Sequence, residues 1–261
     1  MNLRIKGKNA LVCGSSKGIG KAAAIEIAKL GANVTLVSRS AETLADIVHE
    51  LDDSQGQRHD FLVADFNDPS GLKRKVHGLV AAKTIHILVN NTGGPPAGPM
   101  LDAEASAFED AFSQHLICNH LLVQAVVPGM KREGYGRIIN VISTSVKAPL
   151  DNLGVSNTVR AAVANWAKTL ANELGPEGIT VNNVLPGATN TGRLQEIINN
   201  KAKASGRSSD EVAAAMKGGI PLRRFAEPEE IGAAIAFLAS PAAAYISGIA
   251  LPVDGGRLKN M

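Results

Sequence analysis

Aromatic side chains are scarce in this sequence, at 3% of 261 residues, so aliphatic residues and glycine must form the core. Such a composition suits helices packed on a parallel sheet better than a β-sandwich. The net charge is only +3, and the basic clusters at 73–75 and 131–132 lack interleaved aromatic residues. These features argue against a nucleic-acid-binding protein, and we interpret the clusters as solvated helix faces.

Cysteines are also few: Cys13 and Cys118 lie far apart, each in an apolar segment. They predict buried, reduced thiols in a cytoplasmic protein rather than a disulfide framework, and no metal site is expected. The N-terminal residues show no apolar core of a secretory signal. The uncharged stretch from Ala233 to Val253 contains prolines and is rich in alanine. We therefore expect a helix end, a loop and a strand there, not a membrane span.

Short β-branched runs alternate with helical patterns along the chain, and no repeat or linker interrupts them. Strands separated by helices predict right-handed crossovers and a parallel sheet. The fold class is therefore α/β, a Rossmann-like doubly wound sheet of seven parallel strands in a three-layer αβα domain spanning residues 1–261. The strands are expected at 9–13, 33–37, 61–64, 85–90, 137–142, 180–185 and 248–253. The helices are expected around 19–30, 42–51, 69–82, 104–127, 155–174 and 228–239.

Residues 191–218, rich in Gly, Lys, Ala, Ser and Asn, break this alternation. We expect a helical insert near the binding cleft that acts as a substrate lid. Its cations Arg193, Lys201 and Lys203 either favour an acidic substrate group or are simply exposed. The stiff, glycine-rich segment 92–99 either lines the same pocket or forms a turn without a catalytic role.

A glycine-rich turn follows the first expected strand and opens the first helix. Glycines let the backbone approach a pyrophosphate, and the helix N-terminus offers free N–H groups. The spacing Gly-x3-Gly-x-Gly differs from the common dinucleotide fingerprint. After the second strand, Arg39 stands where an NAD site usually has an acid, so NADP(H) is the expected cofactor. The phosphate site is predicted to comprise Gly14, Ser15, Ser16, Lys17, Gly18, Ile19 and Gly20.

Several further motifs occur in the order typical of one family. They are Asp65-Phe66, Asn90-Asn91-Thr92-Gly93, Pro186-Gly187 to Thr191, and Tyr245-Ile-Ser-Gly followed by Val253-Asp-Gly-Gly. Over nearly its whole length the sequence resembles the short-chain dehydrogenase/reductase family, in particular its 3-oxoacyl-acyl-carrier-protein reductase-like branch. The resemblance implies a carbonyl/alcohol reaction with a nicotinamide cofactor, in a homotetramer or homodimer. It also implies cofactor contacts from Asp65, Phe66, Asn91, Gly93, Pro186, Gly187, Thr189 and Thr191.

The family's catalytic residues are Asn, Ser, Tyr and Lys, and this sequence keeps their spacing but not their types. The Ser position falls on Ser143, the Tyr position on Ser156, and the Lys position on Arg160. The Asn position falls on His115, with Asn119 one helical turn further on. A serine hydroxyl is a far weaker acid than a phenol, and arginine stays protonated. Arg160 can still bind ribose hydroxyls or a substrate carboxylate.

Loss of a general acid costs about 10²–10⁴-fold in rate. A proton could instead come through Ser143, a water or His115, although a satisfied helix histidine is the favoured interpretation of His115. Tyr135 and Tyr245 are not ready substitutes for the missing phenol. The sequence thus predicts an NADP(H)-dependent reductase of a ketone or acyl thioester, with an altered proton donor. The alternative is a catalytically impaired cofactor-binding or regulatory subunit of a mixed oligomer.

Overall fold

A computed structural model describes residues 1–259 of the chain, and its centre is a seven-stranded parallel sheet in the order β3-β2-β1-β4-β5-β6-β7. This order confirms the predicted doubly wound fold, since the chain starts in the middle and winds outward in both directions. Every strand begins within two residues of its expected position. The strands are β1 (Asn9–Cys13), β2 (Asn33–Ser38), β3 (Asp60–Val63), β4 (Ile87–Asn90), β5 (Gly136–Val141), β6 (Ile179–Pro186) and β7 (Ala250–Val253).

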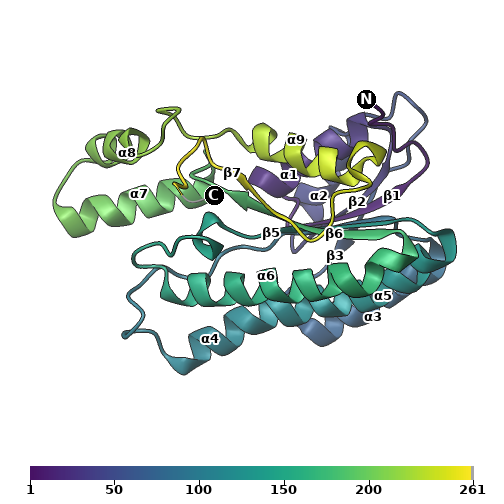
Figure 1. Ribbon diagram of the computed structural model, residues 1–261, viewed down its shortest axis with the longest axis horizontal. Coiled ribbons are helices and arrows are strands. Elements are labelled where there is room, and N and C mark those ends of the chain that lie inside the picture. Colours follow the sequence, from purple (N-terminus) through teal and green to yellow (C-terminus); the bar gives the residue numbers. More distant parts are fainter. Residues whose placement is uncertain (260–261) are drawn as a thin grey trace.

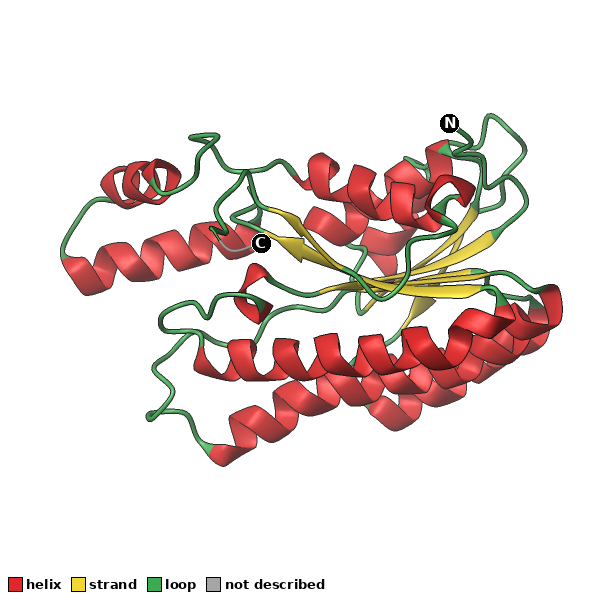
Figure 2. Ribbon diagram, in the orientation of Figure 1, coloured by secondary structure: helices red, strands yellow, loops and turns green. Residues whose placement is uncertain are grey.

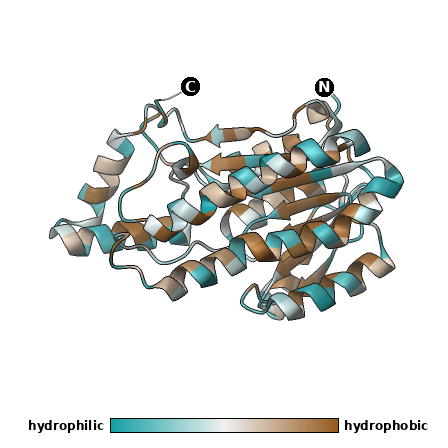
Figure 3. Cartoon of the chain, turned by 60° about the horizontal axis from the view of Figure 1, so that its bottom comes forward, coloured by the Kyte–Doolittle hydropathy of each residue, from teal (hydrophilic) through white to brown (hydrophobic). Residues whose placement is uncertain are grey.

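Helices cover both faces of the sheet (Figures 1 and 2). One face carries α1 (Gly18–Lys29), α2 (Ala41–Val48) and α9 (Pro228–Ala239), and the other carries α3 (Pro69–Ala82), α5 (Cys118–Glu133) and α6 (Gly154–Leu174). Each face has its own apolar cluster, because successive strand residues point to opposite sides. Figure 3 shows hydrophobic residues on the strands and an alternation of hydrophobic and hydrophilic residues along the helices.

The helix expected at 104–127 differs from the prediction. It consists of α4 (Ala105–Phe112), a π-helical turn at Ser113–Ile117, and α5, which continues through Pro128 to Glu133. Proline removes one helical hydrogen bond, but Pro128 is exposed and water can satisfy the freed carbonyl. The single left-handed residue Gly134 then ends the helix. A π turn inside a helix often marks a functional site, and this one contains His115.

The insert at 191–218 forms two helices, α7 (Gly192–Ser205) and α8 (Ser209–Gly218), which extend beyond the edge of the sheet (Figure 1). They share a small apolar cluster of their own, built on Leu194, Ile198 and Val212. The helical content is as predicted, whereas a lid movement stays a prediction.

Both cysteines are buried and free, as predicted. Burial raises the pKa of the Cys13 thiol, and it raises the pKa of the Cys118 thiol to about 11, so neither is a ready thiolate. Within residues 1–259, no helix combines the length and apolar character needed to cross a bilayer.

Candidate active site

The glycine-rich turn between β1 and α1 adopts a backbone that side chains would disrupt. Gly14 and Gly18 have positive φ angles of 61° and 55°. A Cβ at Gly20 would lie 2.2 Å from the carbonyl oxygen of Gly14 and 2.7 Å from Nδ2 of Asn91. The turn is therefore tightly folded at the start of α1, where the N-terminal N–H groups can receive an anion.

Two side chains hold this turn in place, that of the buried Ser15 and that of the half-buried Asn91. Ser15 Oγ accepts a 2.9 Å hydrogen bond from the Val37 amide, which ties the turn to the end of β2. Asn91 Nδ2 donates to the carbonyl oxygens of Cys13 and Gly14, each at 3.3 Å. Both residues were predicted as cofactor contacts, and the structure gives them a positioning role in the turn.

Lys17 and Arg39 are the cations at this end of the site, and both are exposed. Within residues 1–259, no carboxylate lies within ion-pair distance of either side chain. Arg39 directly follows β2, beside the glycine-rich turn that Ser15 joins to this strand. Both charges are thus available to a phosphate on the ribose.

The other predicted cofactor residues lie along the same carboxyl edge of the sheet. Asp65 follows β3, and its Oδ1 accepts hydrogen bonds from Asn67. Phe66 packs against the apolar cluster on the α5 face. Gly93 lies beyond β4, and Pro186 ends β6. Gly187 approaches the chain after β7 so closely that a Cβ would lie 2.7 Å from Cα of Asp254.

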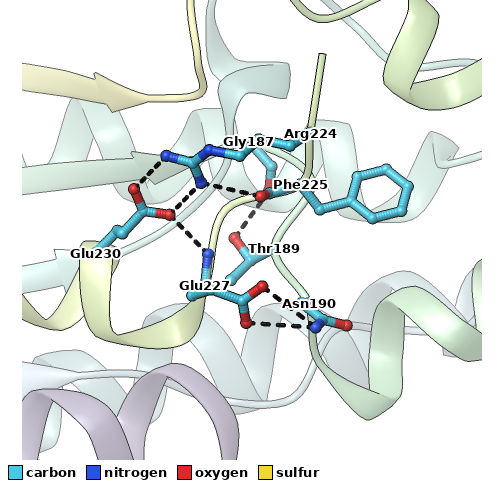
Figure 4. Close-up of polar contacts among 7 residues, drawn as sticks. All are labelled: Gly187, Thr189, Asn190, Arg224, Phe225, Glu227 and Glu230. Carbon is cyan, nitrogen blue, oxygen red and sulfur yellow. Dashed lines mark hydrogen bonds and ion pairs between the residues drawn. The ribbon is translucent and has the colours of Figure 1, made fainter. Parts of the chain in front are cut away.

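The segment entering the lid is fixed at its base (Figure 4). Asn190 Nδ2 lies 3.3 and 3.4 Å from the two carboxylate oxygens of Glu227. Arg224 forms a two-point ion pair with Glu230, with both N–O distances 2.6 Å. Thr189 pairs with Ala226 in a short bridge. Thr191 caps α7, and its methyl group would lie 3.2 Å from a Cβ on Gly18, so the lid base touches the glycine-rich turn.

The predicted catalytic serines lie at the carboxyl end of β5 and in the first turns of α6. Ser143 is half-buried, and its Oγ accepts a 3.1 Å hydrogen bond from the Ser145 amide. Its hydroxyl hydrogen is therefore left to donate to another acceptor. Ser156 is also half-buried, and its hydroxyl has no hydrogen-bond partner in the described part of the chain.

Arg160 lies one turn beyond Ser156 on α6 and points into the sheet edge, where it is only 8% exposed. Its Nη1 donates to the Val141 carbonyl oxygen at 3.0 Å and its Nη2 to that of Thr92 at 3.5 Å. Burial lowers the pKa of this guanidinium to about 10, with a smaller contribution from the charge of Arg193. Arg160 therefore stays charged at neutral pH.

His115 is 1% exposed in the π turn between α4 and α5. Its Nδ1 forms a hydrogen bond with Thr92 Oγ1, and its Nε2 has no partner among the residues that the structure describes. Burial, assisted by the charge of Arg160, lowers its pKa to about 2. An imidazole that is neutral at pH 7 argues against the hypothesis that His115 donates the proton as an imidazolium.

The two tyrosines lie away from this cluster, as expected. The Tyr135 hydroxyl donates to the Ala239 carbonyl oxygen, and its ring stacks against Arg137 at the amino end of β5. Tyr245 is fully exposed after α9. Neither phenol replaces the one missing at position 156.

Sequence reasoning overlooked two residues that the structure brings into the cleft. Thr92 joins His115 and Arg160, since its hydroxyl bonds the first and its carbonyl oxygen accepts from the second. Arg193, treated as one of several lid cations, donates to the Pro95 carbonyl oxygen at 2.7 Å. The motif after β4 contains Thr92 and could have indicated its role. The contact of Arg193 with Pro95 depends on the position of the insert in the folded protein, which the sequence pattern does not give.

Comparison with known proteins agrees with this geometry. A family model described as enoyl-(acyl carrier protein) reductase matches residues 14–257. The chain belongs to the short-chain dehydrogenase/reductase family. It is 33% identical to the 3-oxoacyl-[acyl-carrier-protein] reductase of Vibrio cholerae, over 97% of this chain and 98% of the relative. It is 30% identical to the 7alpha-hydroxysteroid dehydrogenase of Escherichia coli, over 100% and 98% of the two chains.

Solved structures of short-chain dehydrogenase/reductases superpose on the whole chain. The L-sorbose reductase of Gluconobacter frateurii, solved with NADPH and L-sorbose, matches with a TM-score of 0.93 and 32% identity over 100% of both chains. The NADPH-dependent reductase YwfH, involved in bacilysin biosynthesis, matches with a TM-score of 0.89 and 28% identity, covering 97% of this chain and 99% of its own. This protein is thus an oxidoreductase by family, built on an unmodified family fold.

Proposed function

We propose that this protein is an NADP(H)-dependent oxidoreductase that reduces a carbonyl group, in a 3-oxoacyl compound or a related ketone, to an alcohol. One observation carries the proposal: the glycine-rich turn that suits a dinucleotide occurs together with Ser143, whose hydroxyl is free to donate. Both features lie at the carboxyl edge of one sheet, where ligands bind in doubly wound folds. A homodimer or homotetramer is proposed with it, on the strength of the family resemblance alone.

The residues present fit the cofactor. A Cβ at Gly20 would collide with the Gly14 carbonyl oxygen, so the tight turn from Gly14 to Gly20, which presents the N-terminal N–H groups of α1 to a phosphate, depends on this glycine. Lys17 and Arg39 have no acidic partner in the described residues and match the charge of a 2′-phosphate. Arg160 can donate to ribose hydroxyls through N–H groups that its two carbonyl acceptors leave free. When bound, the cofactor supplies the hydride.

Ser143 would orient the substrate. Because its Oγ already accepts from the Ser145 amide, its hydrogen is directed toward another acceptor, such as the carbonyl oxygen of a ketone. This hydrogen bond strengthens as negative charge develops on that oxygen, which lowers the barrier to hydride addition.

The proton that completes the alcohol must come from a source other than a phenol or an imidazolium. The pKa of His115 at about 2 leaves the ring neutral, and Tyr135 lies at the opposite end of the sheet. Water that reaches the alkoxide, with the hydroxyl of Ser156 beside it, supplies the proton in this proposal. The reaction should therefore be slow compared with one that has a positioned acid, by about 10²–10⁴-fold.

The test is NADPH oxidation with a panel of β-keto thioesters, diketones and aldehydes. Ser143→Ala is compared with the parent and with Ser70→Ala, which removes an exposed serine on α3. We expect turnover that falls about 10²-fold or more in Ser143→Ala only. Tight NADPH binding without turnover of any substrate would instead favour the alternative of a cofactor-binding subunit.

A further inference from the structure

The most unusual charge in the cleft is the guanidinium of Arg160, because it is buried without an acid. In the part of the chain that the structure describes, its polar partners are the carbonyl oxygens of Val141 and Thr92. No carboxylate of the described residues lies within ion-pair distance of its guanidinium. Buried charges are normally paired, since an isolated one loses its hydration without compensation. Ribose hydroxyls could occupy its free N–H groups, but they are neutral and leave the charge uncompensated.

Arg137 is a second buried arginine, at the amino end of β5 and away from the candidate site, and it serves as a comparison for Arg160. It is 4% exposed and, within residues 1–259, also has no carboxylate at ion-pair distance. However, its guanidinium stacks over the Tyr135 ring at 4.3 Å and donates to two carbonyl oxygens. Such stacking stabilises a partly desolvated cation. No aromatic ring lies over Arg160 in the described residues, so its charge still needs a partner.

A second guanidinium approaches the same region from the lid. Arg193, in the first turn of α7, donates from Nη2 to the Pro95 carbonyl oxygen, and its Nε lies near Gly94. Burial is the main cause of the lowered pKa of Arg160, and the charge of Arg193 lowers it further. The acidic group near Arg193 is Glu196, 3.3 Å away on the same helix and 65% exposed, so this ion pair offsets little charge.

The two guanidiniums contact the same short segment, Arg160 at the Thr92 carbonyl oxygen and Arg193 at that of Pro95. The exposed glycines 93 and 94 lie between these contacts, and a Cβ placed on Gly93 would meet no atom within 4 Å. We infer that the substrate carries a carboxylate, bound between Arg160 and Arg193 in the open space beside Gly93. The inference rests on the proposed function, and it narrows the substrate class to oxo acids.

The carboxylate would have two consequences in the cleft. It compensates the buried charge of Arg160 with charge-assisted hydrogen bonds, which are the strongest that a guanidinium forms. It also attaches the lid to the substrate, because Arg193, one of its two proposed partners, belongs to α7 of the lid. Substrate binding would then hold the lid closed over the site, and a neutral ester of the same shape would not.

The first experiment measures binding without chemistry. Hexanoate and hexanamide, which contain no ketone, are titrated calorimetrically into the full-length protein saturated with NADPH. We expect hexanoate to bind at least about tenfold more tightly than hexanamide. Arg193→Gln should remove most of that preference, and Arg160→Gln should remove it if the variant still folds. Arg74→Gln, which changes an exposed arginine on α3, is the control and should preserve it.

Equal or undetectable binding of both probes, or a preference that survives Arg193→Gln, would overturn the inference. The second experiment compares reduction of 4-oxohexanoate with that of its methyl ester. Reduction of the ester as fast as the acid would also overturn the carboxylate site, while the proposed reductase would stand. A hexanoate preference without turnover of any ketone would support the carboxylate site and count against the proposed reaction.

Discussion

The two ends of the cleft are built in different ways. At β1 and β2, the site consists mainly of backbone: positive-φ glycines, the N-terminus of α1 and exposed cations. At the carboxyl end of β5, together with α6 and the π turn before α5, it consists of side chains. Among the described residues, several buried polar atoms here have no partner, namely His115 Nε2, Asn119 Oδ1 and Ser145 Oγ. A backbone site tolerates few substitutions, since its shape depends on the absence of side chains. A side-chain site can change its chemistry one residue at a time while the fold persists.

The largest expected effect comes from restoring the family's residues at the side-chain end. Ser156→Tyr combined with Arg160→Lys places a phenol and an ammonium four residues apart on one helix face. If the geometry there is intact, kcat should rise by about 10²-fold or more, and the pH–rate profile should gain an ionisation from the new phenol. Steady-state NADPH oxidation measures both quantities. The Ser156→Phe Arg160→Lys variant, which lacks the hydroxyl, should show no such gain.

Breaking the backbone end should have the next largest effect. Gly20→Ala places a Cβ 2.2 Å from the Gly14 carbonyl oxygen, so the turn must move. We expect NADPH affinity to fall about 10- to 100-fold, as for overpacked sites. Gly78→Ala in α3 is the matched control, because a Cβ there meets nothing within 4 Å. Similar affinities for the two variants would show that the turn is not the phosphate site.

The preference for NADPH over NADH should depend on the exposed charge of Arg39, and removing this charge should have a smaller effect than Gly20→Ala. Arg39→Ala should weaken NADPH binding about tenfold and leave NADH binding nearly unchanged, since the 2′-phosphate is absent from NADH. Calorimetric titration of both cofactors decides this, with Arg74→Ala as the control for lost positive charge. An equal loss for NADPH and NADH would contradict a phosphate contact at Arg39.

The smallest expected effect concerns His115 and is a change in how the free energy of unfolding depends on pH. The pKa of its ring is lowered from 6.5 to about 2 in the folded protein. Below pH 6.5 the unfolded chain therefore binds a proton that the folded chain does not, so folding stability falls as the pH drops. Between pH 6.5 and 5 this loss is about 2 kcal/mol.

His115→Asn should remove that part of the pH dependence, whereas His77→Asn, at an exposed site on α3, should keep it. Urea unfolding at pH 7 and pH 5 measures the difference. The same His115→Asn variant should leave the pH–rate profile between pH 5 and 8 unchanged. If the pH–rate profile of this variant lost an ionisation that the parent shows, His115 would be supported as the proton donor.

The same contrast explains which features the sequence could predict. The strands, the helices and the glycine-rich turn follow from apolar periodicity and from residues with special backbone freedom, which act locally. The continuation of α5 through Pro128 was missed because its tolerance depends on exposure to solvent. The sequence left two roles open for His115 because only tertiary burial beside Arg160 sets its protonation state. The contact between Arg193 and Pro95 depends on the folding of the lid, which no local pattern encodes.

The central claim is that a cleft without the usual acid still transfers hydride to a carbonyl. The most direct measurement incubates the protein with a ketone and with NADPH that carries deuterium at both C4 positions of the nicotinamide, and determines the mass of the alcohol formed. The account predicts one deuterium on the carbinol carbon, formed slowly by the parent and not by Ser143→Ala. NADPH bound at saturation with no deuterated alcohol from any ketone would contradict it, and would identify the chain as a cofactor-binding subunit.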